Sequence, residues 1–200
     1  AAGGTFYPPA TLKAIGSFAR RRKLSLHIDG ARLFNAAVAL SVPVAALCTE
    51  THTVTFCISK GLGAPVGAVL CGTQPFIAEA RRVRKMLGGG MRQAGIIAAA
   101  GVYALSNNIE RLAEDHENAR TIARALAATK WAQLDPDDVV TNIIYFRTPG
   151  KDAEGVVEAL ARQGILSGAT AADQVRFVTH IDISRADVKE IVRMLEKVRV

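Results

Sequence analysis

A single lysine, Lys60, stands between an apolar run and a glycine-containing loop in the stretch FCISKGLGAPVGAVLCG, residues 56–72. The run TVTFCIS (53–59) predicts a strand, and Asp29 ends the preceding predicted strand, LSLHID (24–29). If these strands are parallel, both residues lie at the carboxyl edge of one sheet, where open α/β sheets bind ligands. An amine that attacks a carbonyl must first lose its proton, and desolvation favours the neutral amine. The pair therefore predicts a Schiff-base lysine beside a buried carboxylate.

Pyridoxal phosphate is the cofactor whose chemistry calls for this pair. The lysine binds the cofactor covalently, and an aspartate keeps the ring nitrogen protonated so that the ring withdraws electrons. Gly61 and Gly63 would let the backbone approach such a cofactor without a side-chain clash. The spacing alone leaves a second interpretation open, because a lysine after a strand is commonly a solvated turn residue.

Other kinds of site have less support. The segment GLGAPVG lacks the G-K-[ST] ending of a P-loop, and its glycine spacing does not fit G-x-G-x-x-G. No metal site is predicted, because the histidines have no paired-ligand spacing and are interpreted as structural or surface residues. They are His27, His52, His116 and His180. His27 shares the strand face of Asp29, so a role beside the site stays an alternative to a structural one.

The composition is that of a folded protein. Half of the 200 residues are hydrophobic, enough to bury the core of one large domain or slightly more. No apolar stretch approaches the roughly 20 residues that cross a bilayer, so no membrane contact and a cytoplasmic location are expected. The three cysteines, Cys48, Cys57 and Cys71, have no C-x-x-C spacing and are interpreted as reduced core residues.

Much of the net charge of +7 lies in two basic clusters, RRRK at 20–23 and RRVRK at 81–85. The first ends a predicted helix, where cations suit the negative end of the helix dipole. Neither cluster is interleaved with aromatic residues that would stack on bases, so nucleic acid is not an expected partner.

Alternating helical and short apolar runs predict an α/β fold whose strands are covered by helices on both faces. Expected strands lie at 24–29, 53–59, 66–72, 139–148 and 174–182. Expected helices lie at 10–22, 30–40, 74–87, 91–106, 108–129, 152–164 and 184–198, the last with Ser184 as its N-cap. We expect a large domain at 1–107, an interdomain helix at 108–130 and a small α+β domain at 131–200.

Four motifs occur in an order and spacing that resemble those of the low-specificity L-threonine aldolases. They are HIDGARLFNAA (27–37), SKGLGAPVGAVL (59–70), KMLGGGMRQAG (85–95) and RFVTHID (176–182). The resemblance extends over nearly all of the chain. It implies fold type I of the pyridoxal phosphate enzymes, the aspartate aminotransferase fold. The chain would then hold the C-terminal part of the three-layer α/β/α large domain and a small α+β C-terminal domain.

The resemblance implies roles for three residues of the large domain. Lys60 matches the Schiff-base lysine, and Asp29 matches the partner of the pyridine nitrogen. Arg32 matches the arginine that contacts the ring oxygen of the cofactor or the substrate carboxylate. A salt bridge on the first turn of a helix is the alternative interpretation of Arg32.

The resemblance also implies roles for three further cations. Arg176 matches the small-domain arginine that clamps the α-carboxylate of the substrate with its planar fork. An exposed arginine on an edge strand is the alternative. Lys85 and Arg92 match residues that reach the cofactor phosphate from the neighbouring subunit, which implies a homodimer or homotetramer with shared active sites.

The implied activity is cleavage of the Cα–Cβ bond of a β-hydroxy amino acid, L-threonine or L-allo-threonine, to glycine and acetaldehyde. A base takes the β-hydroxyl proton while the cofactor accepts the electrons. An aromatic amino acid β-lyase or a transaminase of the same fold would use Lys60 and Asp29 in the same way. An inactive fragment that serves only as an assembly surface is the alternative outside enzymes.

The N-terminal end departs from the family pattern. The chain opens at Ala1 within a predicted loop, AAGGTFYPP. Members of the family have a substantial preceding part, which carries the phosphate-binding loop and the histidines near the ring. We therefore expect this chain to lack that part of the enzyme.

Overall fold

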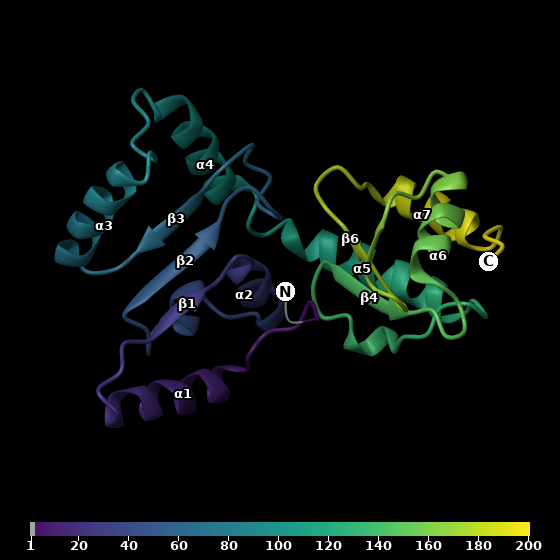
Figure 1. Ribbon diagram of the computed structural model, residues 1–200, viewed down its shortest axis with the longest axis horizontal. Helices are drawn as coiled ribbons and strands as arrows, with labels where there is room; N and C mark the ends of the chain where they lie inside the picture. Colours follow the sequence, from purple (N-terminus) through teal and green to yellow (C-terminus); the bar gives the residue numbers. More distant parts are fainter. Residues whose placement is uncertain (1–2) are drawn as a thin grey trace. The chain divides into compact units, whose positions relative to one another are not determined.

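The computed structural model describes residues 3–200, which pack as two units (Figure 1). Tyr7–Arg111 forms one, called the N-terminal unit. Leu112–Val200 and the described residues before Tyr7 form the other, called the C-terminal unit. The domain boundaries proposed from the sequence remain a prediction. Among residues 3–200, no helix is both long and apolar enough to cross a membrane.

The N-terminal unit contains a three-stranded sheet in the order β1 (His27–Asp29), β2 (Thr53–Cys57), β3 (Ala68–Cys71). β1 and β2 are parallel, with Asp29 opposite Thr55. Their connection passes through helical segments, as parallel neighbours require. β3 is antiparallel to β2 and follows it through the short segment that carries Lys60. The sheet therefore has one parallel pair, whose carboxyl ends meet at one edge.

The two faces of this sheet differ in polarity. Three apolar strand residues pack in one cluster with Leu33 and Ala37: Ile28, Val54 and Phe56. Alternation along the strands places polar residues on the opposite face: His27, Asp29, Thr53 and Thr55. On that face the Nδ1 atom of the His27 ring lies 2.8 Å from the Thr53 hydroxyl. His27 therefore shares the face of Asp29, as predicted, and bonds to the neighbouring strand.

The helices of this unit are buried to different degrees. α2 (Leu33–Leu40) begins shortly after β1 and is largely apolar, which explains why it packs on the sheet. None of the 13 described residues of α3 (Gln74–Met86) is buried. The other helical segments are α1 (Pro9–Arg21), η1 (Val44–Leu47) and α4 (Gly95–Asn107).

Large apolar side chains are exposed on α3, α4 and the segment between them. We call this the α3–α4 surface, and its members are Phe76, Val83, Met86, Leu87, Met91, Ile96, Val102 and Tyr103. Leu87 is 82% exposed and Ile96 is 86% exposed. Large exposed apolar side chains on one part of a folded protein make this surface a candidate interaction site.

The C-terminal unit contains an antiparallel sheet in the order β4 (Ile143–Arg147), β6 (Gln174–Val178), β5 (Gly168–Ala171). The helical segments of this unit are α5 (Leu112–Ala127), η2 (Pro136–Asp138), α6 (Ala153–Arg162) and α7 (Arg185–Leu195). β5 was not predicted, because its residues, GATA, are small and lack an alternating apolar pattern. The N-cap Ser184 is confirmed: its hydroxyl accepts from the Asp187 amide, and the Asp187 carboxylate accepts from the Ser184 amide.

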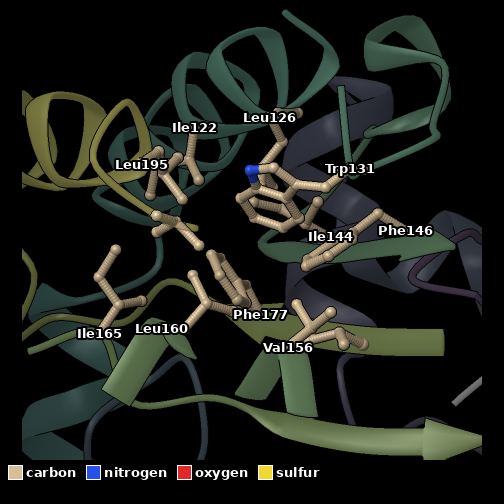
Figure 2. Packing of buried hydrophobic residues seen from close by; sticks show 14 of the residues in the cluster. Ile122, Leu126, Trp131, Ile144, Phe146, Val156, Leu160, Ile165, Phe177 and Leu195 are labelled. Atoms are coloured by element: carbon tan, nitrogen blue, oxygen red, sulfur yellow. The ribbon is translucent and has the colours of Figure 1, made fainter. Parts of the chain in front are cut away.

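An aromatic cluster forms the centre of the C-terminal core (Figure 2). The ring of Phe146 lies edge-on to two others, with centroid distances of 5.9 Å to Trp131 and 5.3 Å to Phe177. Aliphatic side chains from α5, α6 and α7 complete the core, among them Leu126, Leu160 and Leu195. The helix at 108–129 in the sequence prediction therefore packs, as α5, into the core of this unit.

The cysteines do not all behave as predicted. All three are free, and Cys48 and Cys57 are half-buried. Burial raises the pKa of the Cys48 thiol, and the charge of Cys71 acts in the same direction. The prediction that Cys71 is a core residue is wrong, since it is exposed. It lies on β3, which has one neighbouring strand in the described sheet and little cover.

Acid is expected to destabilise the C-terminal unit through His116, which is 2% exposed on α5. Burial lowers the pKa of His116 from 6.5 to about 4, and the positive charge of Arg120 acts in the same direction. Between these pH values the His116 imidazole is protonated in the unfolded chain and neutral in the folded chain. Stability is therefore full above about pH 6.5 and falls by about 3 kcal/mol toward pH 4.

Urea unfolding at a series of pH values measures this loss. His116→Gln should remove most of the slope between pH 6.5 and 4. The matched control is His180→Gln, which should keep the slope because it leaves the buried imidazole of His116 in place. An unchanged slope in His116→Gln would contradict the assignment.

Candidate active site

Lys60 lies in a loop that the backbone closes directly after β2. We call residues 58–67 the Lys60 loop. The Ile58 amide donates to the Gly67 carbonyl at 3.1 Å, and the Ala64 amide donates to the Ile58 carbonyl at 3.0 Å. Within the loop, the Gly63 amide donates to the Lys60 carbonyl at 2.8 Å, and Gly63 has a φ of 75°, which favours glycine. These bonds hold Lys60, which is half-buried, at the carboxyl end of β2.

Asp29 ends β1 and is followed by a glycine that the packing requires. The Gly30 amide donates to the Thr55 carbonyl at 2.7 Å, which continues the parallel pairing past Asp29. A Cβ atom at Gly30 would lie 3.0 Å from Leu33 Cβ and 3.1 Å from the Thr55 carbonyl oxygen. The close approach of β1 and β2 at this point therefore favours glycine after the aspartate.

Asp29 and Lys60 follow neighbouring strands at the same edge of the sheet. β1 and β2 run in the same direction, so the carboxylate and the amine both occur at carboxyl ends. The expectation of a buried carboxylate is wrong, since Asp29 is exposed. Its strand face, shared with His27, has no apolar cover in the described part of the chain comparable to that of α2 on the other face.

Arg32 is the N-cap residue of α2, three positions beyond Asp29. It is half-buried, and its Nε atom is buried. The Arg32 carbonyl accepts from the Ala36 amide at 3.2 Å, so the backbone of Arg32 is fixed by the first turn of the helix. The segment between β1 and α2 therefore carries both the Asp29 carboxylate and the Arg32 guanidinium.

Lys85 and Arg92 flank the glycine run on the α3–α4 surface, and both are exposed. The helix expected at 91–106 begins later than predicted, because α4 starts at Gly95 and Arg92 lies in a bend. A Cβ atom at Gly90 would lie 2.5 Å from Lys85 Cδ. The lysine stem therefore lies against backbone that glycine leaves accessible.

Arg176 belongs to the C-terminal unit and lies on the outward face of β6. It is exposed, whereas its strand neighbours Val175 and Phe177 are buried. Its paired residues across the sheet are Tyr145 on β4 and Gly168 on β5. The alternative of an edge strand is wrong, because β6 is the central strand of this sheet.

One residue near Lys60 was not predicted. The side chain of Asn108 bonds to the Lys60 loop, at Leu62. The sequence prediction places Asn108 as the first residue of the helix at 108–129, whereas in the structure it follows α4 and α5 begins at Leu112.

The side chains fit pyridoxal phosphate better than a metal. Among residues 3–200, no cluster of three or more histidine, cysteine, aspartate or glutamate side chains could hold a metal ion. An amine on a closed loop, a carboxylate at the neighbouring strand end and a guanidinium three residues beyond that carboxylate are the groups that this cofactor uses. The exposed Asp29 and His27 show that the polar face at that edge of the sheet is accessible.

Comparison with solved structures defines the class of fold. The structure of Leishmania major threonine aldolase superposes with a TM-score of 0.76 and 17% sequence identity. The match covers 98% of the present chain and 58% of the aldolase chain. The structure of ureidoglycine-glyoxylate aminotransferase from Bacillus subtilis superposes with a TM-score of 0.65 and 18% sequence identity. The match covers 98% of the present chain and 57% of the aminotransferase chain. The chain has fold type I of the pyridoxal phosphate enzymes, which confirms the predicted fold class.

Sequence comparison defines the family. Residues 1–149 match the family model of the beta-eliminating lyases, and the chain belongs to that family. The low specificity L-threonine aldolase of Escherichia coli strain K12 is 43% identical over 94% of the chain. The chain spans 55% of the length of that enzyme. The resemblance to the low-specificity L-threonine aldolases is thus confirmed.

Proposed function

We propose that this chain is part of a pyridoxal phosphate-dependent lyase that cleaves L-threonine and L-allo-threonine to glycine and acetaldehyde. The observation that carries the proposal is the placement of Lys60 and Asp29 after neighbouring parallel strands. The reaction and substrate are supported by the 43% identity to the threonine aldolase of E. coli.

Each site residue then has a task. Lys60 supplies the amine that binds the cofactor covalently, and its closed loop limits where that amine can reach. Asp29 holds a proton at the ring nitrogen by its negative charge. When bound, the cofactor stabilises the negative charge left on the substrate when its Cα–Cβ bond breaks.

The arginines and Lys85 bind anionic groups in this proposal. Arg176 holds the substrate carboxylate, for which a planar guanidinium gives two parallel hydrogen bonds. Arg32 contacts the ring oxygen of the cofactor or the substrate carboxylate. Lys85 and Arg92 bind the phosphate of the cofactor in a neighbouring copy. Their exposure and their position on the apolar α3–α4 surface support a homodimer or homotetramer. The proposal includes a cytoplasmic location for this oligomer.

The family itself supports a second candidate, β-elimination, because the matching model is that of beta-eliminating lyases. Lys60 and Asp29 would serve that reaction, or transamination, in the same way. The products separate the candidates: aldol cleavage of threonine yields acetaldehyde, whereas β-elimination yields ammonia and an α-keto acid.

Covalent capture of the cofactor tests the proposal directly. The chain is mixed with one equivalent of pyridoxal phosphate, reduced with borohydride and digested for peptide mass mapping. We expect the pyridoxyl group chiefly on Lys60, and far less on the exposed Lys23 and Lys130, which are internal controls. An even distribution over the exposed lysines would contradict the proposal.

A further inference from the structure

A side chain from the end of α4 bonds to the backbone of the Lys60 loop. The Asn108 Nδ2 atom donates to the Leu62 carbonyl oxygen at 2.8 Å. Leu62 follows Lys60 by two positions and is 3% exposed, so its backbone is well packed. We propose that Asn108 is a positioning residue, which fixes the Lys60 loop and thereby the amine. The proposal rests on the proposed function for the role of Lys60.

Asn108 is itself held in place by α4. Asn108 directly follows α4, and its backbone amide donates to the Ala104 carbonyl at 2.9 Å. Ala104 is 1% exposed. One turn earlier, a Cβ atom at Gly101 would lie 2.8 Å from Ile58 Cδ1. Because α4 packs this closely against Ile58, the first residue of the Lys60 loop, the side-chain amide of Asn108 is held at a fixed position relative to that loop.

The Leu62 carbonyl accepts from outside the Lys60 loop, through Asn108. The hydrogen bonds inside the loop use the carbonyls of Ile58, Lys60 and Gly67. Asn108 supplies the donor for the carbonyl of Leu62, in a partly buried setting. Loss of the donor leaves a desolvated carbonyl and removes the tie between loop and helix, so the loop opens more often.

A looser loop changes the reaction of Lys60 and not merely stability. Covalent capture requires the amine to approach the carbonyl of the cofactor within a narrow range of positions. Asn108 touches neither partner in that step and acts through the backbone of the loop. A variant at Asn108 should therefore slow capture at Lys60 while the fold stays intact.

The chain offers a matched control in the preceding residue. Asn107 is exposed, and its Nδ2 atom donates to the Tyr103 carbonyl at 2.8 Å within its own helix. Asn108→Asp replaces the donor by an acceptor that faces the Leu62 carbonyl, at almost unchanged size. Asn107→Asp makes the same chemical change at a site without contact to the Lys60 loop.

Two measurements on the 200-residue chain test the proposal. Hydrogen exchange without cofactor reports loop opening through the amides of Gly63 and Ala64, and we expect about tenfold faster exchange in Asn108→Asp. The rate of borohydride-trapped capture at Lys60 should fall about tenfold in the same variant. Asn107→Asp should resemble the unsubstituted chain in both, and circular dichroism should be equal for all three.

Three results would overturn the proposal. The first is unchanged exchange at Gly63 and Ala64 in Asn108→Asp. The second is an equal effect of Asn107→Asp, which would indicate a general effect of charge at the helix end. The third is faster exchange with an unchanged rate of capture at Lys60. Failure of the unsubstituted chain to react at Lys60 would instead overturn the proposed function, and the exchange data would distinguish that case.

Discussion

Lys60→Ala is expected to abolish covalent capture of pyridoxal phosphate at the Lys60 loop. Any release of acetaldehyde from L-threonine that the unsubstituted protein shows should fall by roughly 10³-fold or more, because the variant has no amine to form the covalent bond. Peptide mass mapping after borohydride reduction measures the capture. A coupled alcohol dehydrogenase assay measures the acetaldehyde.

Lys60→Arg separates the covalent role from that of a positive charge. Arginine keeps the charge but stays protonated, so it does not act as the nucleophile. It should lose capture as completely as alanine does. Lys23→Ala, a change at an exposed lysine of the same unit, should leave capture at Lys60 unchanged. Retained capture or turnover in Lys60→Arg would sink the assignment.

Phe146→Ala is expected to lower the free energy of unfolding of the C-terminal unit by about 4 kcal/mol. Phe146 is 1% exposed and lies edge-on between Trp131 and Phe177, so truncation removes buried area and two ring contacts at once. The cavity would open beside Trp131, the one tryptophan of the chain. Tryptophan fluorescence during urea unfolding therefore reports this unit directly.

Phe76→Ala is the matched control for this large effect. Phe76 is 42% exposed on α3, in the N-terminal unit, so its truncation should leave the fluorescence transition of Trp131 within about 0.5 kcal/mol of the original. A loss below 1 kcal/mol in Phe146→Ala would show that the aromatic cluster contributes little to the core.

The helices with a strong apolar period were predicted within a few residues. The prediction at 74–87 corresponds to Gln74–Met86, and that at 152–164 corresponds to Ala153–Arg162. Strand limits were less accurate, as LSLHID (24–29) shows, since only His27–Asp29 pairs as a strand. A helix satisfies its own backbone, whereas a strand extends only as far as its neighbour supplies partners.

The arrangement of Asp29 and Lys60 could be predicted because parallel strands present their carboxyl ends together. The exposure of Asp29 could not, because burial depends on what covers a face and not on the strand that forms it. Asn108 could not be found either. It meets Leu62 across 46 positions, through a side chain and a backbone carbonyl, and such a contact leaves no local pattern in the sequence.

The hydrogen bonds of the Lys60 loop have a consequence for the order in which the site forms during folding. The bonds from Ile58 to Gly67 and from Gly63 to Lys60 join residues of one short segment, so closing them costs little chain entropy. Structures of this size form in roughly 1–10 μs. The contact of Asn108 with Leu62 spans 46 positions and has a larger closure cost, so it forms later. The turn that carries the lysine thus arises from local contacts, and the helix that holds it in place arrives afterwards.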